Sequence, residues 1–168
     1  AVNKGSKGVL LGLGDPVRTL PTEFSGALPP PFAKAVVYCP GCLVVQGPAF
    51  ADDRAAAAAL AKVDALAQWP LVVLVDDASK AAKSDVNFLW TTFTRFEPAA
   101  DLHARDLRLV HSQPSWTPPV VIDARMKPSY PKELFCDPDT AKQVSRRWRE
   151  YFPRGDVAMG DSDRGHLD

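Results

Sequence analysis

The sequence predicts a single α/β domain with a mostly parallel sheet and covering helices, preceded by an extended proline-rich arm. Between residues 33 and 152, apolar runs of strand type alternate with helical patterns, which is typical of parallel strands joined by helices. Leu71 to Val75 is a continuous apolar run, as expected for a strand buried on both faces. Sixteen prolines in 168 residues predict long connections without regular structure.

The composition excludes several classes of partner. Twenty Lys and Arg residues balance twenty Asp and Glu residues, so no net field attracts nucleic acid or an anionic membrane surface. No apolar run approaches the roughly 20 residues that span a bilayer, and the first residues lack the apolar core of a secretory signal. Three cysteines cannot pair completely, which favours a reducing compartment. We therefore expect a cytoplasmic protein with no nucleic-acid or membrane partner.

Residues 1–32 are predicted to form the extended arm. A short strand fits residues 9–13, but the prolines between 16 and 31 break any regular element after it. Prolines remove the backbone donors that a helix or inner strand needs. The arm's apolar side chains are therefore expected to lie across a second chain; they are Leu20, Phe24, Leu28 and Phe32. Residues 153–168, rich in Gly, Asp, Ser and Arg, are expected to be a flexible tail.

The first half of the domain, which we place at residues 33–152, predicts two strands, a helix and a third strand. Short strands are expected at 33–38 and 43–45. Asp52 and Asp53 can cap a helix that continues to Ala67 with one apolar stripe and ends before Pro70. The strand at 71–75 follows.

The second half predicts two helices separated by two short strands. Ser84 can cap the first helix, which ends before Pro98. Its apolar face would carry Val86, Leu89, Trp90 and Phe93. Strands are expected at 107–110 and 120–122. Asp137-Pro138-Asp139 predicts the start of the last helix, because a capping side chain precedes a proline in the first turn, and the helix should continue to about Phe152.

Cys39-Pro40-Gly41-Cys42 is the most specific local motif. Two thiols at this spacing can chelate zinc or form a reversible disulfide. Zinc would need two further ligands, and the candidates are Cys136 with one of His103, His111 or His166. Redox chemistry would require the motif to open a helix, whereas the residues after Cys42 indicate a strand. The structural interpretation is two small buried thiols beside a Pro-Gly turn. The candidate metal ligands are Cys39, Cys42 and Cys136.

The glycines near the start do not form a dinucleotide-binding loop. Gly8, Gly12 and Gly14 suggest the pattern, but Val17 stands where its third glycine would fall and Pro16 precedes any helix. The geometry that cradles a phosphate is therefore missing.

Two charged segments, Asp76-Asp77 and residues 146–149, are expected to have structural rather than catalytic roles. Asp76 and Asp77 follow a buried strand, but adjacent strand residues point to opposite faces, so we expect a helix cap or loop anchor rather than a carboxylate pair. The basic run at 146–149 is expected to form a solvated helix face with Trp148 packed inward. No residue is assigned a catalytic or cofactor-binding role.

Five segments resemble, in order, the C-terminal domain of the UbiD family of prenylated-flavin-dependent decarboxylases. The resemblance covers roughly residues 28–152. The segments are Leu28-Pro29-Pro30 before the strand Ala35-Val36-Val37, the strand 71–75 ending in Asp76-Asp77, the block from Trp90 through Thr94-Arg95 and Glu97-Pro98 to Asp101, Ile122-Asp123-Ala124, and Asp137-Pro138-Asp139 with Trp148. Residues 113–119 depart from the family's Gly-rich stretch, and the Cys-Pro-Gly-Cys motif has no counterpart.

The resemblance implies a role within a larger enzyme. In the family, prenylated FMN, its manganese and potassium ions and the acid-base residues belong to an N-terminal domain that these 168 residues do not match. It therefore implies a small subunit, or a detached C-terminal domain, of an aromatic acid decarboxylase or carboxylase. Its partners would be a flavin-bearing UbiD-like subunit, a homo-oligomer, or both. The alternatives are a non-enzymatic assembly or regulatory protein, and a small zinc or thiol-redox protein that uses Cys39 and Cys42.

Overall fold

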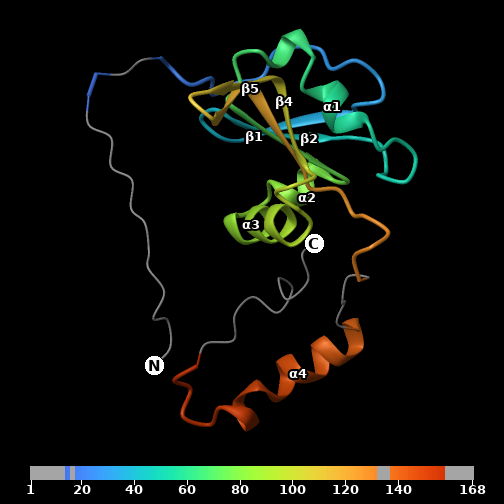
Figure 1. Ribbon diagram of the computed structural model, residues 1–168. Helices are drawn as coiled ribbons and strands as arrows, with labels where there is room; N and C mark the ends of the chain where they lie inside the picture. Colours follow the sequence, from blue (N-terminus) through green and yellow to red (C-terminus); the bar gives the residue numbers. More distant parts are fainter. Residues whose placement is uncertain (1–13, 16–17, 132–136, 158–168) are drawn as a thin grey trace.

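The computed structural model describes residues 14–15, 18–131 and 137–157, which form one α/β domain on a five-stranded sheet (Figure 1). The strand order is β1-β2-β3-β5-β4. The strands are β1 (Lys34–Cys39), β2 (Cys42–Gln46), β3 (Leu71–Val75), β4 (Leu102–Val110) and β5 (Gln113–Asp123). The helices are α1 (Ala56–Leu60), the 3₁₀ turn η1 (Asp64–Leu66), α2 (Ala78–Ala81), α3 (Asp85–Thr94) and α4 (Pro138–Tyr151).

The sheet is mixed, so the expectation of a mostly parallel sheet is wrong. Strand β3 pairs in parallel with β2 and β5, whereas β1–β2 and β4–β5 are antiparallel. Two tight turns cause the difference, because a two-residue connection permits only antiparallel pairing. Pro40-Gly41 joins β1 to β2, with Gly41 at φ 78° as the second turn residue requires. His111 and Ser112 join β4 to β5 at φ 49° and 62°.

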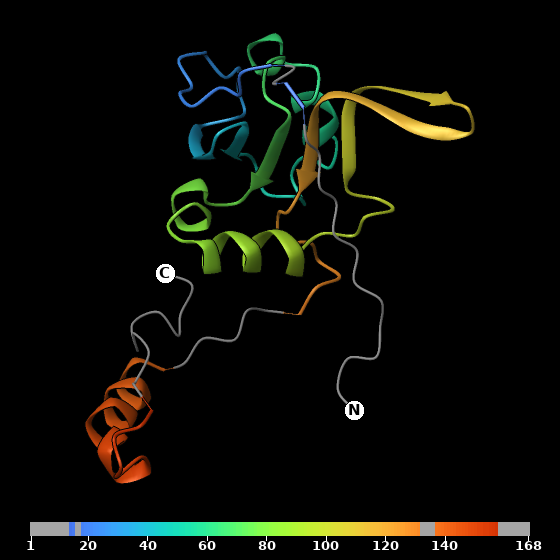
Figure 2. The same ribbon diagram turned by 90° about the vertical axis from the view of Figure 1, so that its left-hand side faces the viewer.

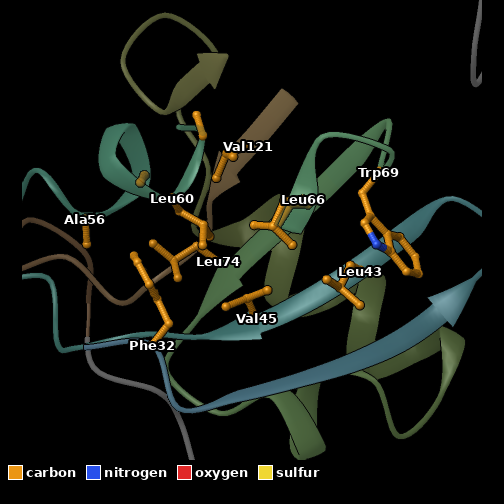
Figure 3. Packing of buried hydrophobic residues seen from close by; sticks show 12 residues of the cluster. Phe32, Leu43, Val45, Ala56, Leu60, Leu66, Trp69, Leu74 and Val121 are labelled. Atoms are coloured by element: carbon orange, nitrogen blue, oxygen red, sulfur yellow. The ribbon is translucent and has the colours of Figure 1, made fainter. Parts of the chain in front are cut away.

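Helices cover both faces of the sheet, and each face has its own core. Side chains alternate along β2, so Leu43 and Val45 point to one face while Cys42 and Val44 point to the other. The first core lies under α1 and η1 and includes Leu60, Leu66, Trp69 and Leu74 (Figure 3). The second lies under α2 and α3 and includes Val73, Val75, Ala78 and Phe88.

The helix expected to end at Ala67 is divided in two, so the prediction of one continuous helix is wrong. Strand-like backbone at Val63, with φ −67° and ψ 119°, separates α1 from η1. Leu60 and Leu66 are both fully buried in the first core, which indicates that packing of both segments outweighs helix continuity. The N-cap of α1 is Ala55 without a side-chain cap, while Asp53 accepts a hydrogen bond from the Ala55 amide.

Residues 18–32 contain no helix or strand and pack on their own domain. Phe32 is 7% exposed in the first core, and Leu28 packs partly buried against it. Phe24 meets Trp69 edge-on, with ring centroids 6.3 Å apart. The expectation that these side chains need a second chain is therefore wrong; Leu20 stays 39% exposed. The strand expected at 9–13 and residues 158–168 of the expected tail lie outside the described residues.

Strands β4 and β5 are longer than predicted and continue beyond the sheet as a two-stranded hairpin (Figure 2). Only Val120–Asp123 of β5 pairs with β3, so the earlier part of β5 pairs with β4 alone. Proline is tolerated in this part of β5 because the edge of the strand that faces away from β4 has no neighbouring strand and needs no backbone N–H donor. Pro118-Pro119 lies opposite the register shift between Ala104 and Asp106.

Helix α4 begins as predicted but does not join the core. Asp137 caps it by accepting a hydrogen bond from the Thr140 amide at 2.8 Å. No residue of α4 is buried, and in both views the helix lies apart from the sheet (Figures 1 and 2). The expectation that Trp148 packs inward is wrong, because its ring contacts Phe152 and its indole N–H donates to the Val157 carbonyl. Among the described residues, no helix is long and apolar enough to cross a membrane.

Candidate functional site

A cluster of charged side chains lies where the parallel strands end. The carboxyl ends of β2, β3 and β5 meet at one edge of the sheet, which is the position of binding sites in many α/β proteins. The charged cluster contains three carboxylates and three cations: Asp76, Asp101, Asp123, Arg95, Arg125 and Lys127.

The centre of the charged cluster is a two-pronged ion pair that is almost completely buried. Arg125 Nη2 lies 2.7 Å from Asp123 Oδ2 and Arg125 Nε lies 2.9 Å from Asp123 Oδ1. The two side chains are 0% and 1% exposed. Arg125 Nη1 donates to the carbonyls of Pro48 and Asp53 at 3.0 and 2.8 Å. This guanidinium therefore fastens the loop after β2 to the end of β5.

A second buried cation connects β5 to the end of α3. Lys127 Nζ lies 3.1 Å from Asp101 Oδ2, and these side chains are 9% and 7% exposed. The same ammonium donates to the carbonyls of Arg95 and Asp123, each at 2.8 Å. Asp101 also accepts a hydrogen bond from the Glu97 amide. All of these contacts hold the segment after α3 against the end of β5.

The third pair lies nearer the surface and anchors the loop after β3. Arg95 Nη1 lies 3.2 Å from Asp76 Oδ2, which also accepts from the Met126 amide at 2.7 Å. Asp77 accepts from the amides of Ser79 and Lys80 and so caps α2, a helix that the sequence pattern did not predict. The predicted roles of this aspartate pair, as cap and loop anchor, are both confirmed.

Two aromatic rings border the buried cations. The Phe50 ring lies 5.2 Å from the Arg125 guanidinium and 5.4 Å from the Lys127 ammonium, within cation–π range. The Tyr130 ring lies 5.5 Å from the Lys127 ammonium. Burial, followed by the nearby carboxylates of Asp101, Glu97 and Asp123, raises the pKa of the Tyr130 hydroxyl. This phenol therefore stays protonated at neutral pH.

The geometry of the charged cluster suits a structural clamp better than catalysis. Each carboxylate faces a cation, and each buried cation is also bonded to backbone carbonyls. A general acid or base needs a proton-transfer atom that can reach a substrate, whereas these atoms are occupied by one another. The clamp fixes four segments: the loops after β2 and β3, the end of α3, and the chain after β5.

The two cysteines of the Cys-Pro-Gly-Cys motif lie on either side of the turn between β1 and β2. Cys39 and Cys42 are cross-strand partners and both are free thiols. Cys42 is buried and Cys39 is exposed, so the interpretation of two buried thiols is confirmed for Cys42 and wrong for Cys39. Burial, with smaller contributions from the neighbouring Cys39 thiol, raises the pKa of Cys42 to about 12. The motif opens a strand rather than a helix, as predicted.

The zinc hypothesis stays a prediction, because Cys136 and His166 lie outside the described residues. Within residues 18–131 and 137–157, no group of three or more His, Cys, Asp and Glu side chains could hold a metal ion.

Sequence reasoning did not identify the charged cluster. It assigned no role to Arg125 or Lys127, although a buried strand followed by alternating charges in Asp123-Ala124-Arg125-Met126-Lys127 was the available signal. The structure also brings together residues from three separate UbiD-like segments, namely Asp76, Arg95 with Asp101, and Asp123. Those segments therefore meet in the charged cluster, which is buried at Asp101 and Asp123 and lies nearer the surface at Asp76.

The chain is similar to part of several longer chlamydial proteins. No family model matches it. It is 46% identical over 151 residues, 90% of its length, to an uncharacterized protein of Chlamydia trachomatis serovar D. It is 44% identical over 152 residues to an uncharacterized protein of Chlamydia muridarum. Over 153 residues, 91% of its length, it is 42% identical to a Chlamydia pneumoniae protein that is named as a subunit of 4-hydroxybenzoate decarboxylase. The chain spans about a quarter (26%) of the length of these curated relatives.

Proposed function

We propose that this chain is a component of a UbiD-like decarboxylase or carboxylase that acts on an aromatic acid or phenol. The observation that carries the proposal is the 42% identity, over 91% of the chain, to the Chlamydia pneumoniae protein named as a 4-hydroxybenzoate decarboxylase subunit. The ordered UbiD-like segments support it, because Asp76, Arg95, Asp101 and Asp123 from three of them meet in the charged cluster. The component is a separate small subunit or a C-terminal domain of a longer polypeptide, and both forms agree with a match to about a quarter of each relative.

The charged cluster does not fit the cofactor that the family resemblance implies. Prenylated FMN carries a phosphate that needs free donors, whereas Arg95, Arg125 and Lys127 each face a carboxylate. The part of the chain that the structure describes also offers no cluster of metal-binding side chains for manganese. We therefore assign the flavin and its ions to a partner, and the bond-breaking chemistry with them.

In this proposal the β4–β5 hairpin is the surface that contacts the flavin-bearing partner. Leu107 lies opposite Trp116, and Leu109 opposite Pro114, so the four side chains share one face of the hairpin. Leu109 is 77% exposed and Leu107 is 52% exposed. An apolar stripe on a hairpin that extends beyond its own sheet (Figure 2) is the kind of surface that a protein interface covers.

The proposal is tested by co-expressing this chain, carrying an affinity tag, with a flavin-bearing UbiD-like chain from the same organism. We expect the two to co-purify, and the flavin absorbance to be retained with the pair. Leu109→Asp should abolish retention, because it places a charge within the apolar stripe, whereas Arg108→Ala on the opposite face of the hairpin should not. Failure of the wild-type chain to retain any flavin-bearing partner would contradict the proposal.

The alternatives give different results in the same experiment. A regulatory or assembly protein would be retained by a partner that carries no flavin. A zinc or thiol-redox protein would retain no partner and would contain one zinc ion per chain, or a disulfide between Cys39 and Cys42 that reducing agent opens.

A further inference from the structure

No described residue pairs with the outer edge of β4 between residues 106 and 110. Strand β4 is the last strand of the sheet, so only its inner edge has a neighbouring strand, β5. This part of β4 also lies in the hairpin that extends beyond the rest of the sheet (Figure 2). An open edge of this kind accepts a further strand unless its own side chains block it.

The turn of the hairpin determines which backbone groups of β4 face outward. Both residues of the turn, 111–112, have positive φ, 49° and 62°, as in a type I′ turn of two residues. The residues that flank such a turn, here Val110 and Gln113, form a hydrogen-bonded pair, and bonded and non-bonded pairs then alternate along the two strands. The N–H and C=O groups of Leu107 and Leu109 therefore point away from β5.

Prolines close the corresponding edge of β5 but not that of β4. Strand β5 carries Pro114, Pro118 and Pro119, whereas β4 carries no proline. Pro114 lies opposite Leu109, in a pair whose N–H positions point outward, so its missing donor removes no bond from the hairpin. On β5 that outward donor is absent, and on β4 it is present. The hairpin therefore offers a new strand the edge of β4 rather than that of β5.

Asp106 covers one of the outward donors of β4. Its Oδ1 atom accepts a hydrogen bond from the Leu107 amide at 2.9 Å, and its Oδ2 atom accepts one from Arg108 Nε at 2.7 Å. The groups left open are the Leu107 carbonyl and both backbone groups of Leu109, which no other described backbone group reaches. Charged side chains of this kind protect an edge strand from unwanted pairing.

The side chains beside the open edge are apolar. Leu107 and Leu109 are 52% and 77% exposed, and Trp116 lies opposite Leu107 at 36% exposure. Every second side chain of an added strand would lie next to them on the same face. In such complexes the backbone hydrogen bonds supply affinity, and the contacts of alternate side chains supply specificity. The edge therefore fits an extended segment with large apolar residues at alternating positions.

The exposed stripe of α3 does not define a partner in the same way. Its four side chains are each more than half exposed: Val86, Leu89, Trp90 and Phe93. The sequence predicted these four as the core face of the helix, and the structure places them outward. The backbone groups in the middle of a helix bond within the helix, so this stripe asks only for an apolar surface. The open groups of β4 also require a partner with extended backbone.

We propose that β4 accepts an extended strand of the flavin-bearing partner, which pairs with the backbone of Leu107 and Leu109 and displaces the Asp106 carboxylate from the Leu107 amide. This pairing rests on the proposed function, since it describes how the hairpin holds that partner. A second copy of this chain is a poorer match. The antiparallel register that bonds both leucines would set Arg108 opposite its own copy, and like charges directly opposite one another destabilise a strand pair. A partner strand can place an acidic or uncharged side chain there.

The test measures binding of the tagged chain to the flavin-bearing UbiD-like chain of the same organism. Leu109→Pro and Leu109→Ala both remove the leucine side chain, but only proline removes the outward N–H. Circular dichroism checks that both variants fold, as expected because Pro114 already occupies the opposite position. We expect Leu109→Pro to bind at least about tenfold more weakly than Leu109→Ala. Asp106→Ala should bind at least about twofold more tightly than the wild type, because the Leu107 donor is then free in advance.

Hydrogen exchange on the unaltered chain gives a second measurement that needs no variant. The Leu109 amide should exchange fast in the free chain and at least about a hundredfold more slowly in the complex. The Arg108 amide belongs to a bonded pair with Ser115 and should exchange slowly in both states, which makes it the internal control.

The outcomes separate this pairing from the proposed function. Equal binding by Leu109→Pro and Leu109→Ala, or unchanged exchange at Leu109 in a complex that retains the flavin, would overturn the pairing and leave the proposed function standing. A wild-type chain that retains no flavin-bearing partner would overturn both. A chain that dimerises by itself with slow exchange at Leu109 would identify a second copy as the occupant and would also overturn the pairing proposed here.

Discussion

Replacing Asp123 with Asn should destabilise the domain severely, although the two side chains have almost the same shape. The carboxylate is 1% exposed and accepts two hydrogen bonds from the Arg125 guanidinium, which is itself 0% exposed. The substitution leaves that cation buried without its counter-charge. Breaking a buried pair in this way costs about 3–5 kcal/mol. For a chain of this size, each kcal/mol lowers the melting temperature by about 2–4 °C, so we expect a decrease of about 6–20 °C.

Urea denaturation followed by circular dichroism measures the effect, with Asp106→Asn as the matched control. Asp106 pairs with Arg108 at the same 2.7 Å distance, but those side chains are 45% and 78% exposed, so the control should unfold at the wild-type urea concentration. Replacing both partners, Asp123→Leu with Arg125→Met, should restore part of the lost stability because no buried charge remains unpaired. A loss below about 1 kcal/mol for Asp123→Asn would refute the interpretation of the charged cluster as a clamp.

Three further predictions concern local features. At pH 8, iodoacetamide should modify exposed Cys39 in the native protein and spare buried Cys42, whose pKa is raised to about 12; peptide mass spectrometry reads the result, and equal labelling would contradict it. Asp77→Ala removes the cap of α2 and should lower the free energy of unfolding by about 0.5–2 kcal/mol, as urea denaturation would show; no loss would mean that α2 needs no cap. Phe24→Ala should lower the melting temperature, because this ring packs on the first core, whereas exposed Glu23→Ala should not; equal melting temperatures for the two variants would show that the arm does not stabilise the domain.

Local signals in the sequence were sufficient where the structure depends on local chemistry. The run 71–75 became β3 with those same bounds, and Ser84 and Asp137 cap α3 and α4 as predicted. The Pro40-Gly41 turn also forms as expected, because proline and glycine fix its backbone angles. In each case a few neighbouring residues determine the conformation.

Tertiary packing decided the features that the sequence patterns missed. Val86, Leu89, Trp90 and Phe93 form a regular apolar stripe, and periodicity cannot distinguish a face that meets its own core from a face that meets another surface. The face of α3 that packs on the core carries Phe88 together with the polar side chains of Asn87, Thr91 and Thr92. The alternating charges at 123–127 were visible in the sequence, but no pattern linked them to the distant residues Asp76, Arg95 and Asp101, and the charged cluster was missed for that reason.

The central proposal is that this chain is a component of a larger decarboxylase and releases no CO2 alone. The most direct measurement is CO2 release from 4-hydroxybenzoate and related aromatic acids by a flavin-bearing UbiD-like chain of the same organism, with and without this chain at equal concentration. We expect the pair to release CO2 faster than the flavin-bearing chain alone, and this chain alone to release none. Full activity of the flavin-bearing chain by itself, or CO2 release by the isolated 168-residue chain, would contradict the claim.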